Sequence, residues 1–200
     1  MNTNNRKRAT RTAAALLALV AVIALAGCGG DDSSVDPGTD PPDFGPALAQ
    51  APPKLKALYA QGGELVPGEL DAFSEQLAAV HGFPAVVNNW ASWCAPCRTE
   101  WPWLQRAAAD NLDEVAFIGV ASDDSDAAVQ TFLDQHPVPY PSFADPDKDI
   151  GNQVGATLVG GLPNTLFFDR DGELVFTHQG VYEDQAALEA DIRKYALGES

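Results

Sequence analysis

The chain has 200 residues and carries 28 acidic against 12 basic side chains, which gives a formal net charge of -16. That length is enough for one ordinary domain with extensions. The acidity argues against nucleic acid as a partner, because the protein would repel phosphate groups. It favours solubility and partners that are neutral or basic.

The first 27 residues have the pattern of a secretory signal peptide. Four basic residues precede an unbroken apolar run over residues 13–26, which is shorter than the roughly 20 residues that a membrane-spanning helix needs. The run ends in Leu25-Ala26-Gly27-Cys28, which resembles the bacterial lipobox, whose cysteine is acylated after the preceding peptide is removed. Cleavage there would leave 8 basic and 28 acidic residues, a formal charge of -20.

We therefore expect a lipid on Cys28 that anchors the chain at the extracytoplasmic face of a bacterial cell membrane. An uncleaved N-terminal anchor is the alternative, and it would also place the remaining chain outside the membrane. In an exported compartment, the two other cysteines can persist as a disulfide.

The composition divides the remainder of the chain into three parts. Residues 28–50 are rich in Gly, Asp, Ser and Pro and cannot bury enough apolar area to fold, so we interpret them as a flexible tether. Residues 51–63 suggest a short helical extension of unknown role. Residues 64–200 then form the folded domain.

Strand and helix patterns alternate through this domain and predict a layered α/β fold with a central mixed sheet flanked by helices. The early strands should be parallel, and the last two should form an antiparallel hairpin. The expected strands cover residues 64–66, 84–90, 114–121, 142–144, 164–169 and 173–178, and the expected helices cover residues 70–80, 98–110, 127–135, 145–154 and 183–197.

The motif Cys94-Ala95-Pro96-Cys97 lies where the inner strand 84–90 gives way to a helix. The first thiol stands at the helix N-terminus, where free N–H groups and the macrodipole favour the reactive thiolate. The second thiol is close enough to resolve a mixed disulfide. Glu100 shares a helix face with Cys97, so its carboxyl could accept the thiol proton or raise the thiol pKa.

Two segments carry a family resemblance. Residues 86–98, which contain the Cys-x-x-Cys motif, and residues 161–172, which contain Gly-Leu-Pro, resemble thioredoxin-like proteins, most closely the extracytoplasmic TlpA/ResA-like branch. The resemblance covers residues 64–197 and implies the thioredoxin fold and thiol–disulfide exchange without a cofactor. It implies that Cys94 attacks, that Cys97 resolves, and that the two form a disulfide.

The same resemblance assigns residues around the two thiols. Trp93 should expose its ring beside the active site. Pro163 matches the family's cis-proline, which lies against the disulfide and helps to hold the substrate chain. Leu162 matches the residue whose backbone pairs with substrate, and Glu100 matches an acid in the ResA-like pattern.

Two adjacent residues depart from the family pattern. Asn88 stands where cytosolic thioredoxins have a buried aspartate, and its neutral amide cannot take a proton, so Glu100 or water would have to serve. Asn89 replaces the usual phenylalanine. If Asn89 is buried without partners, it should cost about 1–3 kcal/mol of stability.

Other interpretations of the Cys-x-x-Cys motif are weaker. Half a zinc site needs two further ligands, but His81, His136 and His178 are scattered, so no metal is expected. A purely structural disulfide fits poorly with the helix start and the preceding tryptophan. Cys94 does not match the peroxidatic cysteine of peroxiredoxins, because that family has a threonine or serine three residues earlier, where this chain has Ala91.

We therefore expect a membrane-tethered oxidoreductase that reduces disulfides of exported proteins. The resemblance implies a membrane electron donor of the CcdA or DsbD kind and makes apocytochrome c, during cytochrome c biogenesis, a candidate substrate. The alternatives are an oxidase that donates its disulfide to exported proteins and a non-catalytic binding domain. A monomer is expected.

Overall fold

A computed structural model describes residues 40–153 and 161–199 of the chain. The expected signal peptide, Cys28 and most of the expected tether lie outside these residues. Within the described ranges, no helix combines the length and the apolar character needed to cross a membrane.

In the described part of the chain, six strands form one mixed sheet in the order β1-β4-β3-β2-β5-β6. The first four strands in the chain are mutually parallel, and the last two are antiparallel, which confirms the expected arrangement. The strands are β1 (Leu65–Val66), β2 (Ala85–Trp90), β3 (Ala116–Ser122), β4 (Ser142–Asp145), β5 (Asn164–Phe168) and β6 (Leu174–Gln179).

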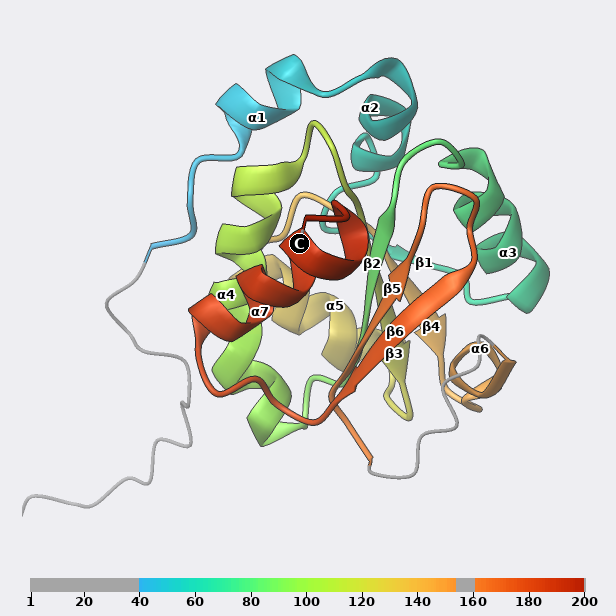
Figure 1. The fold of residues 1–200 in the computed structure, drawn as a ribbon. Helices are drawn as coiled ribbons and strands as arrows, with labels where there is room; N and C mark the ends of the chain where they lie inside the picture. The colour runs from blue at the N-terminus through green and yellow to red at the C-terminus, as the bar shows by residue number, and fades with distance from the viewer. Residues whose placement is uncertain (1–39, 154–160, 200) are drawn as a thin grey trace, which may run out of the picture. The chain divides into compact units, whose positions relative to one another are not determined.

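Helices cover both faces of this sheet, with α4, α5 and α7 on one side and α3 and α6 on the other (Figure 1). The expected helix 98–110 begins earlier, directly after Cys94, and the expected helix 183–197 divides into α7 and a π-helix, η1. The helices are α1 (Gly45–Gln50), α2 (Pro53–Tyr59), α3 (Leu70–Ala79), α4 (Ala95–Asn111), α5 (Asp126–Gln135), α6 (Asp149–Gln153), α7 (Gln185–Asp191) and η1 (Ile192–Ala196).

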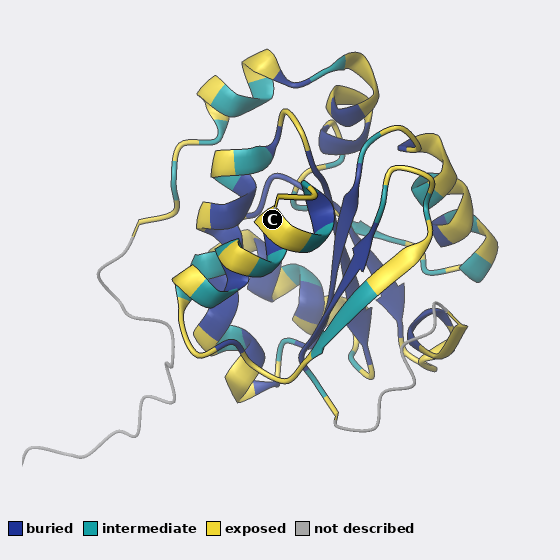
Figure 2. Ribbon diagram, viewed as in Figure 1, coloured by how far each residue is buried: buried dark blue, intermediate teal, exposed yellow. Residues whose placement is uncertain are grey.

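The core is centred on β2 and β3, in which every residue is buried (Figure 2). Such continuous burial is typical of inner strands covered on both faces. On the α4 side of the sheet, Trp90, Trp101 and Phe132 form an aromatic cluster with ring centroids 4.5–5.2 Å apart. This cluster joins β2, α4 and α5, and so fixes the helix that carries the two cysteines.

The segment before β1 is more ordered than the sequence predicted. Residues 45–50, expected to be part of the flexible tether, form α1, which has Pro46 in its first turn and packs Leu48 against the core. Helix α2 buries Leu55, Leu58 and Tyr59 in the core. The Tyr59 hydroxyl donates to the Val115 carbonyl and accepts from the Phe117 N–H, which ties α2 to β3.

The strand register gathers three loops at one end of the sheet. In the antiparallel pair β2–β5, Asn89 is opposite Asn164, so the chain leaving β2 lies beside the chain entering β5. In the parallel pair β2–β3, Trp90 is level with Ala121. The Cys-x-x-Cys segment, residues 161–163 and the loop after β3 therefore share this end.

Candidate active site

Cys94 is the N-cap residue of α4, and its sulfur forms a disulfide with Cys97. The sulfurs are 2.02 Å apart and the Cα atoms 5.3 Å apart. The Cys97 N–H donates to Cys94 Sγ at 3.2 Å, and Pro96 occupies the first helical turn, where its missing N–H removes no helical bond. After reduction, a thiolate on Cys94 would accept from the same N–H at the positive end of the helix dipole.

Trp93 is held beside this disulfide by the loop that follows β3. Its indole N–H donates to the Asp123 carbonyl at 2.8 Å, and the N–H of Ser92 donates to Asp124 Oδ2 at 2.6 Å. The Trp93 side chain is nevertheless 59% exposed, in contrast to the cysteines, which are 3% and 1% exposed. The ring therefore forms a fixed apolar surface at the site, and its predicted exposure is confirmed.

The loop before β5 reaches the same end of the sheet. The Leu162–Pro163 peptide bond is cis, as the family resemblance implied. The Pro163 carbonyl accepts from the Gly180 N–H at 2.9 Å, and Leu162 is half-buried against the core. The register places these residues at the same end of the sheet as the Cys-x-x-Cys segment.

Glu100 is completely buried one turn after Cys97. Its Oε1 accepts from Asn88 Nδ2 at 3.2 Å, and its Oε2 accepts from the Tyr182 N–H at 3.3 Å. Burial raises the pKa of Glu100 to about 7, although these two hydrogen bonds oppose the change by stabilising the carboxylate. A carboxyl group with this pKa can gain or lose a proton near neutral pH.

The adjacent asparagines of β2 occupy different environments. Asn88 points toward α4, and its Nδ2 lies 3.4 Å from Thr165 Oγ1 in addition to its bond with Glu100. Asn89 points to the other face and is 1% exposed, yet neither of its amide atoms has a partner among the described residues. Asn164, directly across the sheet, also has an unpartnered Oδ1 there.

Sequence reasoning missed Tyr182 and Thr165, which complete the surroundings of Glu100. Tyr182 lies in the loop between β6 and α7, where no motif or periodicity marks it. Its contribution to Glu100 comes from its main-chain N–H, which any residue type except proline would supply. Thr165 follows Asn164 in a strand that the sequence predicted, but its contact with Asn88 depends on the strand register.

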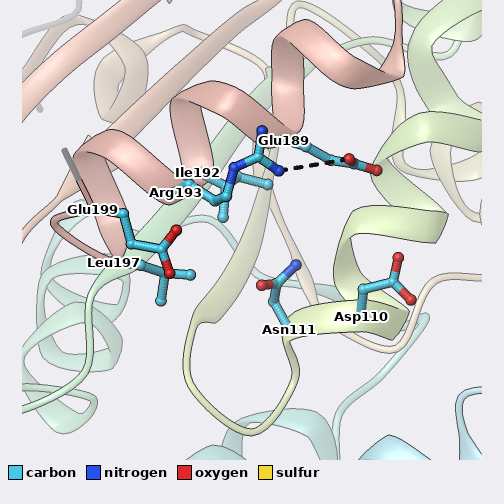
Figure 3. A pocket seen from close by; sticks show the side chains of 7 residues that line it. All are labelled: Asp110, Asn111, Glu189, Ile192, Arg193, Leu197 and Glu199. Atoms are coloured by element: carbon cyan, nitrogen blue, oxygen red, sulfur yellow. Dashed lines mark ion pairs between the residues drawn. The ribbon is translucent and has the colours of Figure 1, made fainter.

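A separate hollow of about 290 Å³ lies at the opposite end of α4 (Figure 3). Arg193 and Glu189 form an ion pair there at 3.8 Å. The hollow contains none of the predicted site residues; its lining comprises Asp110, Asn111, Glu189, Ile192, Arg193, Leu197 and Glu199. Within residues 40–153 and 161–199, no three His, Cys, Asp or Glu side chains are grouped to hold a metal ion.

The raised pKa of Glu100 predicts a particular dependence of stability on pH. Because the pKa rises from its ordinary value of 4.5 to about 7, the folded protein binds this proton more tightly than the unfolded chain. The resulting stabilisation is complete below about pH 4.5 and is lost as the pH rises through 7, a loss of about 3 kcal/mol. Glu100→Gln cannot ionise, so its free energy of unfolding should lack this decrease.

Urea unfolding of the oxidised protein at intervals from pH 4 to 9 measures the effect without titration of Cys97. Relative to the parent chain, Glu100→Gln should gain stability as the pH rises. Glu114→Gln provides the same chemical change at an exposed position. A constant difference between Glu100→Gln and the parent across this range would contradict the prediction.

Comparison with known proteins agrees with this arrangement. A sequence model of the Redoxin family matches residues 63–192. The chain is 28% identical over 113 residues to the thiol-disulfide oxidoreductase ResA of Oceanobacillus iheyensis, an alignment that covers 56% of this chain and 57% of that protein. It is 34% identical over 108 residues to the thiol:disulfide interchange protein DsbE of Pseudomonas fluorescens biotype C, and this alignment covers 54% of this chain and 57% of that protein.

Solved structures also share the fold. A secreted disulfide oxidoreductase of Mycobacterium tuberculosis, homologous to E. coli DsbE, is 27% identical and superposes with a TM-score of 0.51 over 57% of this chain and 84% of that one. The α/β fold is therefore thioredoxin-like, as predicted. The chain spans less than three fifths of the length of the two curated relatives above. The family match covers most of the chain, including the whole sheet and both cysteines, and the chain belongs to the Redoxin family.

Proposed function

We propose that the protein is a thiol-disulfide oxidoreductase whose working groups are Cys94 and Cys97. The observation that carries this proposal is the disulfide at the start of α4, with Cys94 as N-cap and the fixed, exposed ring of Trp93 beside it. A purely structural disulfide has no need of a helix N-terminus that stabilises a thiolate. The names of the ResA and DsbE relatives support the same chemistry.

In the proposed reaction, the Cys94 thiolate attacks one sulfur of a substrate disulfide. A mixed disulfide forms, and the second substrate sulfur leaves as a thiolate. Cys97 then loses its proton and attacks Cys94 Sγ, which breaks the mixed disulfide and releases the first substrate sulfur. The substrate gains two electrons, and the protein ends with the Cys94–Cys97 disulfide.

Glu100 is the proposed acceptor of the Cys97 proton. It is one turn away on the same helix, is fully buried, and has a pKa near neutrality because of that burial. Asn88 cannot accept this proton, because its amide is neutral, but its Nδ2 donates a hydrogen bond to the Glu100 carboxylate. Leu162 and Pro163 are proposed to hold the substrate chain alongside Trp93.

We further propose that the enzyme works outside the cytoplasmic membrane on disulfides of exported proteins, anchored by a lipid on Cys28. The lipobox resemblance and the secreted M. tuberculosis relative support this location. A membrane donor of the CcdA or DsbD kind would return the two electrons. Apocytochrome c before haem attachment is the specific substrate that the ResA-like pattern suggests.

Redox equilibration tests the proposal and its direction. For a reductase, the disulfide should open and reclose reversibly in dithiothreitol or glutathione buffers, with a potential at or below about -240 mV. The ratio of reduced to oxidised protein can be read from mass spectrometry after rapid alkylation.

A potential of about -120 mV would instead identify an oxidase that donates its disulfide. A disulfide that does not exchange with either reagent on the timescale of a free peptide disulfide would leave only the binding-domain alternative.

A further inference from the structure

The loop between β6 and α7, residues 180–184, lies over the carboxyl group of Glu100. The Tyr182 N–H donates to Glu100 Oε2 at 3.3 Å, and this is the only contact with that oxygen among the described hydrogen bonds. Tyr182 itself is 2% exposed and Glu100 is completely buried, so Tyr182 helps to shield this carboxyl from water. Contacts that fix the position of Tyr182 therefore also fix the hydrogen bond to Glu100 Oε2 and its shielding from water.

The Tyr182 side chain is anchored at its far end. Its hydroxyl donates to Asp191 Oδ2 at 3.1 Å, and its ring stacks on His178 with centroids 3.7 Å apart and planes 11° apart. His178 Nδ1 lies 3.6 Å from the same Asp191 oxygen. Burial and the nearby carboxyl of Asp191 raise the pKa of Tyr182, so its hydroxyl remains a donor.

The strand register connects this anchor to the residues that bind the other oxygen of Glu100. His178 is opposite Thr165 in the β5–β6 register, Thr165 Oγ1 lies 3.4 Å from Asn88 Nδ2, and Asn88 donates to Glu100 Oε1. One oxygen of Glu100 thus accepts a hydrogen bond from a strand of the sheet, and the other accepts one from the loop. The sheet side is rigid because β2 is an inner strand, whereas the loop side depends on the side-chain anchor.

We propose that Tyr182 is a positioning residue for Glu100, with Asp191 and His178 as its anchor. This proposal rests on the proposed function, in which Glu100 accepts the proton of Cys97. Among the described residues, the other titratable groups near Glu100 are the buried Tyr140 and, in the reduced protein, Cys97 one turn earlier on α4.

Titration of Glu100 in the oxidised full chain tests the positioning, because Cys97 then carries no proton. Tyr182→Phe removes the hydroxyl that binds Asp191 and keeps the ring. The loosened loop should admit water to the carboxyl, which lowers its pKa, while the weakened Tyr182 N–H bond acts in the opposite direction. Because burial is the larger cause of the raised pKa, the titration midpoint of Glu100, followed by carbon NMR, should fall by about one pH unit. Asp191→Ala should act in the same way, whereas Asp191→Asn keeps an acceptor oxygen and should titrate like the parent.

Tyr195→Phe is the matched control, because it removes a hydroxyl from η1 that makes no hydrogen bond to Glu100 or Asp191 among the described residues. The pH profile of the resolving step, measured from a preformed mixed disulfide, should shift to acid in Tyr182→Phe by the same amount. Unchanged midpoints in both Tyr182→Phe and Asp191→Ala would overturn the proposal. If the parent chain exchanged no disulfides, the proposed function would fail, while the Glu100 titration would still decide the positioning.

Discussion

Replacing Cys94 with serine is expected to reduce insulin-disulfide reduction to the rate of dithiothreitol alone. The thiolate is the attacking species, and a serine hydroxyl supplies no comparable nucleophile at neutral pH. The substitution leaves an N-cap residue that is well suited to α4, so the fold should persist. Turbidity of precipitating insulin measures the rate, and circular dichroism checks the helix.

The companion variant Cys97→Ser separates attack from resolution. It keeps the attacking thiol and removes the resolving one, so mixed disulfides should accumulate and be visible on a non-reducing gel. Both variants are best made with Cys28→Ser, which leaves no third thiol to exchange. Activity of Cys94→Ser equal to that of the parent would show that the site has been wrongly assigned.

Features set by local chemistry were predictable from the sequence. The turn Asp169-Arg170-Asp171-Gly172 joins β5 to β6 because Asp169 Oδ1 accepts from the N–H groups of Asp171 and Glu173, both at 3.0 Å, and Gly172 has φ 80°. The strand–helix junction at Cys94 was likewise marked by the apolar run before it and by Pro96 after it. In both places, a few neighbouring residues determine the backbone.

Features that depend on distant contacts were not predictable in this way. Helix α1 is too short to be stable alone, and it forms where Leu48 packs against the core. The link between Tyr182 and Glu100 joins residues 82 positions apart through a main-chain N–H. The face of the sheet to which Asn89 points is set by how β2 pairs with β3 and β5. All six residues of β2 are buried, so the sequence pattern of this strand does not distinguish one face from the other.

The two adjacent asparagines should respond oppositely to the same substitution. Asn89→Leu removes a buried amide whose atoms have no partner in the described structure, so it should raise the free energy of unfolding by about 1–3 kcal/mol. Asn88→Leu deprives Glu100 Oε1 of its donor and should lower that free energy by about 1–3 kcal/mol. The loss should be larger at pH 8 than at pH 5, because the bond is stronger to the ionised carboxylate.

Urea unfolding of the two variants and the parent, at both pH values, measures these differences. Each variant is the control for the other, because the same change in volume and strand propensity occurs at neighbouring positions of one inner strand. If Asn89→Leu destabilised the protein as much as Asn88→Leu, the Asn89 amide would have partners in solution, such as buried water. Opposite signs would show that Asn88 stabilises β2 through the Glu100 carboxyl, while Asn89 is a buried polar group that the surrounding packing has to compensate.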